Sequence, residues 1–172
     1  YSNPAFRQWS ASGLAVVWAE ENTRDSIFNA FRRKETYATS GTRIKLRFFA
    51  GKDLDNSPLS DENLIKKAYS KGVPMGGDLV GLEESPEFFV WAVRDTRGAP
   101  LQRVQIIKGF VENAIGDPVG RPNERVYDVA CSDGLVVDPV SQRCTDNGAK
   151  VNLADCSISS DVGASELKTY WK

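Results

Sequence analysis

The stretch Thr42-Arg-Ile-Lys-Leu-Arg-Phe-Phe49 decides the fold class, because apolar and basic side chains alternate along it. Successive side chains of a β-strand point to opposite faces of a sheet, so a period of two predicts a strand with one buried and one solvated face. The basic side chains are expected in solvent. The side chains expected on the buried face are Ile44, Leu46 and Phe48.

Later segments repeat this strand character and are joined by short polar connections. They are Phe88 to Val93, Leu101 to Val111 and Arg125 to Ala130, with Asp95-Thr-Arg-Gly98 as a turn between the first two. Sequential strands joined in this way favour an antiparallel sheet or sandwich over alternating parallel units. The sequence therefore predicts an α+β, mainly β fold built on an antiparallel β-sheet or sandwich.

One helix is predicted as an insertion between the strands. Ser60 is expected to cap it and Gly72 to end it, since hydroxyl side chains favour helix starts and glycine favours helix ends. Its apolar face is expected to hold Leu64, Ile65, Ala68 and Tyr69.

A strand and a helix are predicted before the sheet, after a connecting segment over residues 1–12. The run Leu14-Ala-Val-Val-Trp-Ala19 is wholly apolar, which is typical of a strand buried on both faces in a parallel sheet. Asn22 or Thr23 then predicts the cap of a helix, and basic residues at its end suit the helix dipole. Its apolar stripe consists of Ile27, Phe28, Ala30 and Phe31.

The composition excludes several classes of function. The chain has no histidine, a net charge of -1 and no apolar run near the roughly 20 residues that span a bilayer. Its basic residues are scattered rather than interleaved with aromatics in a stripe. We therefore expect no catalytic residue, no metal ligand, no cofactor, no nucleic-acid partner and no transmembrane segment in this chain. Two alternatives stay open at this point: carboxylate-only chemistry such as glycoside hydrolysis, and calcium binding by the loop aspartates Asp133, Asp138, Asp146 and Asp161.

The three cysteines lie close together in polar, turn-rich sequence. Cys131 and Cys144 are the candidate disulfide, and Cys156 is expected to be free or paired outside the chain. A disulfide implies an oxidising compartment, so we expect an extracytoplasmic protein, periplasmic or secreted. The remainder of this region is predicted to be a disulfide-tied loop.

Long runs of the chain resemble one bacterial family of domains of unknown function, which is similar to PHP-type metallohydrolases and carbaryl-hydrolase-like enzymes. The runs that carry the resemblance are Gly13 to Arg24, Phe28 to Arg43, Val73 to Asp78, Ala99 to Gly109 and Tyr127 to Gly134. The resemblance implies a signal sequence and a distorted barrel whose divalent-metal ligands precede Tyr1. It also implies a continuation past Lys172 with a further cysteine.

On that resemblance, residues 1–41 would be the closing strand and helix of the upstream barrel plus a bridge, and residues 42–172 a β-rich C-terminal domain. The bridge residues expected to face the barrel are Glu35, Thr36, Tyr37, Thr39 and Gly41.

Two functions are then open. The first is a non-catalytic C-terminal region that supports the barrel of an extracytoplasmic metal-dependent hydrolase, with that barrel as its partner in the same polypeptide. Without the barrel, the chain is expected to self-associate through its N-terminal strand and helix. The second is an independent secreted β-sandwich that binds a partner through Phe89, Trp91 or the cysteine-rich loops.

Overall fold

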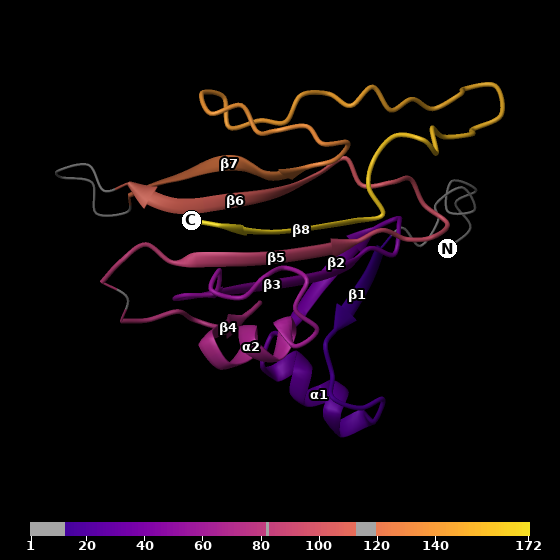
Figure 1. Ribbon diagram of the computed structural model, residues 1–172. Coiled ribbons are helices and arrows are strands. Elements are labelled where there is room, and N and C mark those ends of the chain that lie inside the picture. Colours follow the sequence, from indigo (N-terminus) through magenta and orange to yellow (C-terminus); the bar gives the residue numbers. More distant parts are fainter. Residues whose placement is uncertain (1–12, 82, 113–119) are drawn as a thin grey trace. The chain divides into compact units, whose positions relative to one another are not determined.

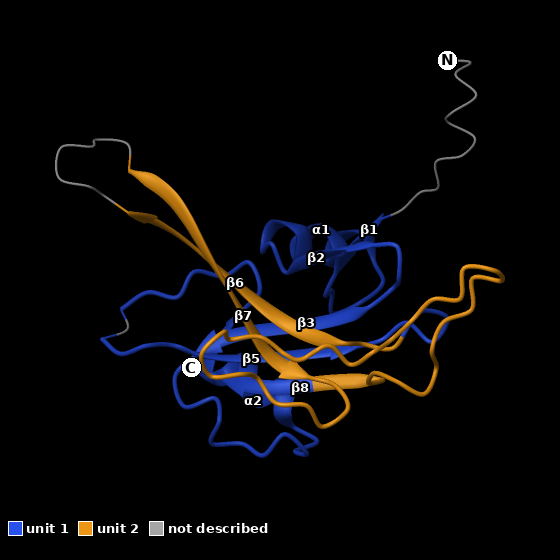
Figure 2. Ribbon diagram, turned by 90° about the horizontal axis from the view of Figure 1, so that it is seen from above, with its two compact units in different colours: residues 1–99, 168–172 blue, residues 100–167 orange. Residues whose placement is uncertain are grey.

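The computed structural model describes residues 13–81, 83–112 and 120–172 (Figure 1). The connecting segment predicted over residues 1–12 lies outside them. The chain divides into two compact units, residues 1–99 with 168–172 and residues 100–167 (Figure 2). The boundary predicted at residue 41, which concerns an upstream barrel, stays a prediction.

The first unit is built around a four-stranded sheet in the order β4-β3-β5-β8. Strand β3 pairs antiparallel with both β4 and β5, and the register with β5 runs from Lys45 opposite Val93 to Gly51 opposite Glu87. Its elements are β1 (Gly13–Val17), α1 (Arg24–Arg32), β2 (Thr36–Ser40), β3 (Lys45–Gly51), α2 (Leu64–Lys71), β4 (Gly72–Pro74), β5 (Glu87–Val93) and most of β8 (Glu166–Trp171). The predicted α+β, mainly β antiparallel class is confirmed.

The core of the first unit lies on one face of this sheet, under α2. Phe49 and Phe89 are almost wholly buried there, and burying such a side chain stabilises the fold by about 1.5 to 3 kcal/mol. The other members of the buried cluster are Leu54, Leu64 and Ala68. Because Phe89 is buried, the prediction that it recognises a partner is wrong.

The predicted strand over residues 42–49 exists, but its most buried side chain lies on the face assigned to solvent. Phe49 shares a face with Arg47, whereas Phe48 on the opposite face is half-buried and stacks on Phe88 at 5.6 Å. The expected buried set of Ile44, Leu46 and Phe48 is therefore wrong as the core face. The physical reason is that α2 covers the Arg47 and Phe49 face, a tertiary contact that alternation along one strand does not specify.

Helix α2 forms where it was predicted, but its start differs. Asn63, not Ser60, stands at the N-cap, and the backbone N–H of Asn63 donates to Asp61 Oδ1 at 2.8 Å. Gly72 ends the helix as predicted. A Cβ at Gly72 would lie 2.4 Å from the carbonyl oxygen of Ala50, so this close approach to β3 requires glycine.

The prediction of a doubly buried parallel strand over residues 14–19 is wrong. Strand β1 pairs antiparallel with β2, from Gly13 opposite Ser40 to Val17 opposite Thr36, and its first three residues are exposed. An apolar run is compatible with either arrangement, and the partner strand settles it.

Helix α1 begins as predicted, with the Ser26 N–H donating to Thr23 Oγ1 at 3.3 Å. Its apolar stripe is only partly covered. Ala30 is buried, whereas the side chains of Phe28 and Phe31 are 59% and 49% exposed. Helix α1 thus presents two large aromatic side chains to solvent.

The second unit contains an antiparallel ribbon of β6 (Arg103–Glu112) and β7 (Arg121–Cys131), with an irregularity between Val104 and Gln105. A loop region follows, and a disulfide joins Cys144 in this loop to Cys131 at the end of β7. Cys156 is exposed and free. Across the described ranges, no helix is both long and apolar enough to cross a membrane.

Candidate functional site

The candidate site is centred on Glu35, a buried carboxylate at the junction of α1 and β2. Lys34 adopts a left-handed backbone conformation with φ of 59°, which turns the chain out of the helix. The Glu35 N–H then donates to the Ala30 carbonyl at 3.1 Å, and the Glu35 carbonyl accepts from the Trp18 N–H at 3.0 Å. These backbone bonds fix a residue that is only 4% exposed.

Three cationic or hydroxyl groups surround the Glu35 carboxylate. Arg33 Nη2 lies 3.5 Å from Oε2, and Arg47 Nη1 lies 3.6 Å from Oε1. The Tyr69 hydroxyl donates to Oε1 and accepts from Arg47 Nη1 at 2.9 Å. A buried carboxylate needs such partners, because an isolated charge would be costly to remove from water.

The Arg47 guanidinium is held from its other side by Trp18. Its central carbon lies 3.4 Å from the centre of the indole ring, a cation–π contact worth about 0.5 to 2 kcal/mol. The indole is itself fixed, because Trp18 Nε1 donates to the Leu46 carbonyl at 2.9 Å. Tyr37 lies beside it, with ring centres 6.3 Å apart. The site therefore holds its guanidinium in one orientation.

These groups line a pocket of about 530 Å³ within the first unit. Carboxylates, guanidiniums, a phenol and apolar side chains all contribute to its wall. The lining residues are Trp18, Ala19, Glu20, Arg33, Glu35, Arg47, Tyr69 and Pro74. The volume falls in the range of roughly 300 to 1,000 Å³ that is usual for small-molecule pockets.

A glycine loop after β4 closes against the turn that precedes Glu35. Gly76 has φ of +82°, and a Cβ there would lie 2.0 Å from the Lys34 carbonyl oxygen. Only glycine permits this approach. The loop over residues 75–78 therefore serves packing beside the site.

The phenol of Tyr69 is tuned by its surroundings. Burial raises the pKa of Tyr69 above its ordinary value, and the hydrogen bond to the Glu35 carboxylate raises it further. The hydroxyl thus keeps its proton at neutral pH and acts as a donor. The site combines a neutral phenol, one buried carboxylate and two guanidiniums.

Of the five predicted bridge residues, only Glu35 lines the pocket. Tyr37 donates from its hydroxyl to the Ile44 carbonyl at 3.1 Å, and the buried Thr39 Oγ1 has no hydrogen-bond partner among the described residues. Thr36 contacts the Lys34 carbonyl, and Gly41 adopts φ of 119°. That the five bridge residues face an upstream barrel stays a prediction.

Sequence reasoning missed Trp18, Arg47 and Tyr69 as members of one site. Arg47 stands on a strand face assigned to solvent, and Tyr69 stands on a helix stripe assigned to the core. Each assignment treats one element alone. Only the packing of α2 on β3 brings these side chains together, so no local pattern could have identified them.

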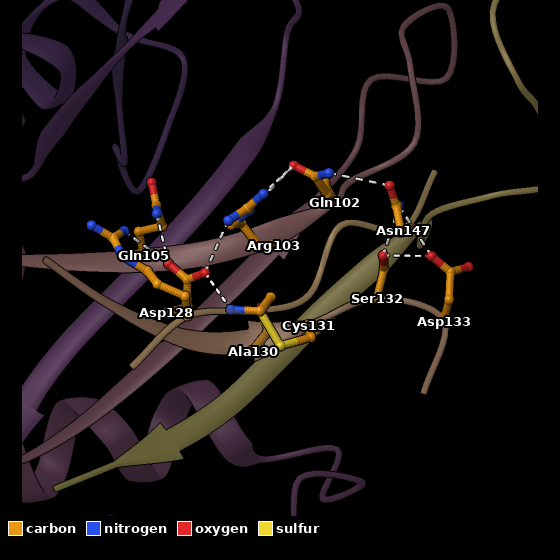
Figure 3. The surroundings of a disulfide bond; sticks show 11 residues. Gln102, Arg103, Gln105, Asp128, Ala130, Cys131, Ser132, Asp133 and Asn147 are labelled. Carbon is orange, nitrogen blue, oxygen red and sulfur yellow. Dashed lines mark hydrogen bonds and ion pairs between the residues drawn. A yellow bond between two sulfur atoms is a disulfide. The ribbon is translucent and has the colours of Figure 1, made fainter. Parts of the chain in front are cut away.

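A second buried carboxylate, Asp128, lies in the second unit beside the disulfide (Figure 3). It is 1% exposed. It accepts from Gln105 Nε2 at 2.6 Å, from the Cys144 N–H at 2.7 Å and from Arg103 Nη1 at 3.1 Å. Arg143 Nη1 lies 3.4 Å away. All of these donors come from the same unit.

The charge on Asp128 is stabilised despite its burial. Burial alone would raise the pKa of Asp128, but hydrogen bonds from the Cys144 N–H, Gln105 and Arg103 together hold it below its ordinary value. Asp128 accepts from the backbone N–H of the disulfide-bonded Cys144 and is not among the residues that line the pocket beside Glu35. It therefore ties the loop after β7 to the ribbon.

A smaller pocket of about 230 Å³ lies beside Glu87, near Lys52 and Lys172. The Glu87 carboxylate accepts hydrogen bonds from the N–H groups of Leu54 and Asp55. It therefore holds the loop that follows β3. Within residues 13–81, 83–112 and 120–172, no group of three or more histidine, cysteine, aspartate or glutamate side chains is arranged to hold a metal ion.

Comparison with known proteins identifies one family. The model of a protein family of unknown function, DUF3604, matches residues 2–172. No curated protein and no solved structure matches the chain.

Proposed function

The chain belongs to the DUF3604 family of proteins of unknown function, and from this premise we propose that it is a non-catalytic supporting region of a larger extracytoplasmic protein. Its partner would be an upstream barrel in the same polypeptide. The observation that carries the proposal is the exposed aromatic side of α1, formed by Phe28 and Phe31. We call these two side chains the α1 aromatic patch.

The α1 aromatic patch has the character of an interface. Residues three apart lie on the same side of a helix, so Phe28 and Phe31 form one surface. Aromatic residues and arginine are enriched at the centres of protein interfaces. The Arg32 guanidinium lies 6.0 Å from the Phe28 ring centre. A complementary partner would offer an apolar pocket with an acidic rim.

The proposed activity of the parent is metal-dependent hydrolysis. It rests on the similarity expected between this family of domains of unknown function, which the runs quoted above resemble, and PHP-type metallohydrolases and carbaryl-hydrolase-like enzymes. The divalent metal would be held by upstream residues, and this chain would support the barrel without contributing a ligand. The disulfide between Cys131 and Cys144 is compatible with the proposed extracytoplasmic location.

The first experiment tests the α1 aromatic patch in the 172-residue chain. Sedimentation velocity is expected to show concentration-dependent self-association, because the patch lacks its barrel. The double variant Phe28→Ser with Phe31→Ser is expected to be monomeric with an unchanged circular dichroism spectrum. The matched control Val136→Ser with Val140→Ser changes two exposed side chains elsewhere and is expected to self-associate as the parent does. A strict monomer at every concentration would contradict the proposal.

The second experiment measures the intact mass and metal content of the protein from its native source. A species much larger than 19.0 kDa with bound divalent metal would support the supporting-region proposal. A metal-free species near 19.0 kDa would favour the alternative, an independent secreted binding module. That alternative is supported by Ile107 and Val111 on β6, which are large and exposed on a ribbon.

A further inference from the structure

The Glu35 pocket contains two guanidiniums, and most of their N–H groups make no hydrogen bond to the described residues. Arg33 and Arg47 reach Glu35 only at 3.5 and 3.6 Å. Charged hydrogen bonds between such groups are shorter, roughly 2.7 to 2.9 Å. Among the described residues, the Arg47 guanidinium donates one hydrogen bond, to Tyr69, and the Arg33 guanidinium donates none. Most N–H groups of both side chains are therefore available to a ligand.

The Arg47 guanidinium is also held in place before any ligand arrives, because it lies between the Trp18 ring and the Tyr69 hydroxyl. Both arginines form ion pairs with the buried Glu35 carboxylate, and the Arg33 side chain is 46% exposed. Two planar donors beside one cavity suit the geometry of a carboxylate or phosphate group. A fixed donor loses less side-chain entropy on binding than a free one.

The rest of the wall defines the other part of the ligand. Trp18, Ala19 and Pro74 supply apolar surface to the pocket. Glu20 is exposed and lines the same pocket, so its charge would oppose an anion. The formal charges of the lining side chains cancel, since two arginines face two glutamates. Removal of the Glu20 charge should therefore favour anion binding.

We propose that the Glu35 pocket binds the oxyanion group of a small organic molecule, a carboxylate or a phosphate, through Arg33 and Arg47. The apolar body of the ligand would lie against Trp18 and Pro74. Glu35 and Tyr69 act as positioning residues, because they hold the arginines. Neither Phe28 nor Phe31 lines this pocket, so the proposal for the α1 aromatic patch and the proposal for the pocket can fail separately.

The test is an NMR titration of the 172-residue chain at constant ionic strength, with inorganic phosphate and separately with benzoate. We expect saturable shifts of the Trp18 indole Nε1–H signal and of the Arg33 and Arg47 Nε–H signals. A stronger response to benzoate assigns the ligand to the aromatic carboxylates. A stronger response to phosphate assigns it to the phosphate esters.

Matched variants separate a built site from general surface charge. Arg33→Gln is expected to weaken binding about tenfold, the loss of one charged hydrogen-bonding group. Arg32→Gln makes the same charge change on the neighbouring residue, which does not line the pocket, and is expected to leave the affinity within about twofold. Arg33→Lys is expected to restore only part of the affinity, because it keeps the charge and loses the planar donor.

Glu20→Gln supplies a test with the opposite sign, because it is expected to tighten binding. Folded-state spectra of each variant establish that the pocket is intact, and Arg47→Lys serves in place of any variant that fails this test. Absence of a saturable shift with both probes would overturn the proposal. Equal losses in Arg33→Gln and Arg32→Gln would also overturn it, since they would show only long-range charge.

Discussion

Glu35 in the first unit and Asp128 in the second are both buried carboxylates with arginine neighbours. The difference between them separates a candidate binding site from a purely structural carboxylate that holds a loop in place. Asp128 accepts hydrogen bonds at 2.6, 2.7 and 3.1 Å. Glu35 meets its arginines at 3.5 and 3.6 Å beside a pocket of about 530 Å³. When the neighbouring donors all hydrogen-bond to the buried carboxylate, as at Asp128, the carboxylate stabilises the fold. When the arginine N–H groups are left partly free, as at Glu35, the carboxylate can position those arginines for a ligand.

The largest expected effect comes from removing the carboxylate that is fully hydrogen-bonded. Asp128→Ala leaves Arg103 Nη1 and the Cys144 N–H without their acceptor, so it should lower the free energy of unfolding by about 3 to 5 kcal/mol. Urea denaturation followed by circular dichroism measures this loss. Asp161→Ala, an exposed aspartate of the same unit, is the control and should change little. Equal losses of unfolding free energy in Asp128→Ala and Asp161→Ala would show that Asp128 has no special structural role.

The next effect comes from the disulfide beside Asp128. Replacing Cys131 and Cys144 together by serine should lower the free energy of unfolding by about 3 kcal/mol, because the unfolded chain gains the freedom of an opened loop. Cys156→Ser is the control, since this thiol is free. Combined with Asp128→Ala, the loss should be less than the sum, because Cys144 contacts both features. Full additivity would contradict the coupling.

Acid should weaken the second unit through the same carboxylate. Hydrogen bonds hold the pKa of Asp128 in the folded state below its ordinary value of 3.8, so the contribution of its charge to stability is complete above about pH 4. The contribution is lost as the pH falls through the folded-state pKa. The free energy of unfolding, measured between pH 2 and pH 7, should therefore fall less steeply at the acid end in Asp128→Asn. Parallel curves for parent and variant would contradict this assignment.

The sequence predicted the fold more fully than the site, and the reason is physical. Alternation over residues 42–49 and the turn at Asp95 to Gly98 are local, and both a strand and a turn form there. The choice of buried face on β3 depends on α2, and the meeting of Arg47 with Glu35 depends on the turn after α1. Such contacts join residues far apart in the chain, so neither hydrophobic periodicity nor motif spacing can predict them.

The predicted disulfide belongs with the local features. Cys131 and Cys144 follow one another in a turn-rich segment, and the structure joins them. Strand β8 was not predicted, because its sequence lies in a region with weak periodicity and is defined by its place beside β5. Asp128 was likewise included in a strand without a role. Its role arises from the loop that returns Cys144 to the ribbon.

The smallest expected effect concerns the pocket and completes the contrast with Asp128. Glu35→Gln keeps an oxygen that accepts from Tyr69, so it should lower the free energy of unfolding by only about 1 kcal/mol. Because the carboxylate no longer raises the Tyr69 pKa, spectrophotometric titration of that phenol should show ionisation at lower pH. Glu20→Gln is the control for the charge change. If Glu35→Gln lowers the free energy of unfolding as much as Asp128→Ala does, Glu35 is a structural carboxylate like Asp128. A small loss together with a lower Tyr69 pKa fits a carboxylate that positions its neighbours.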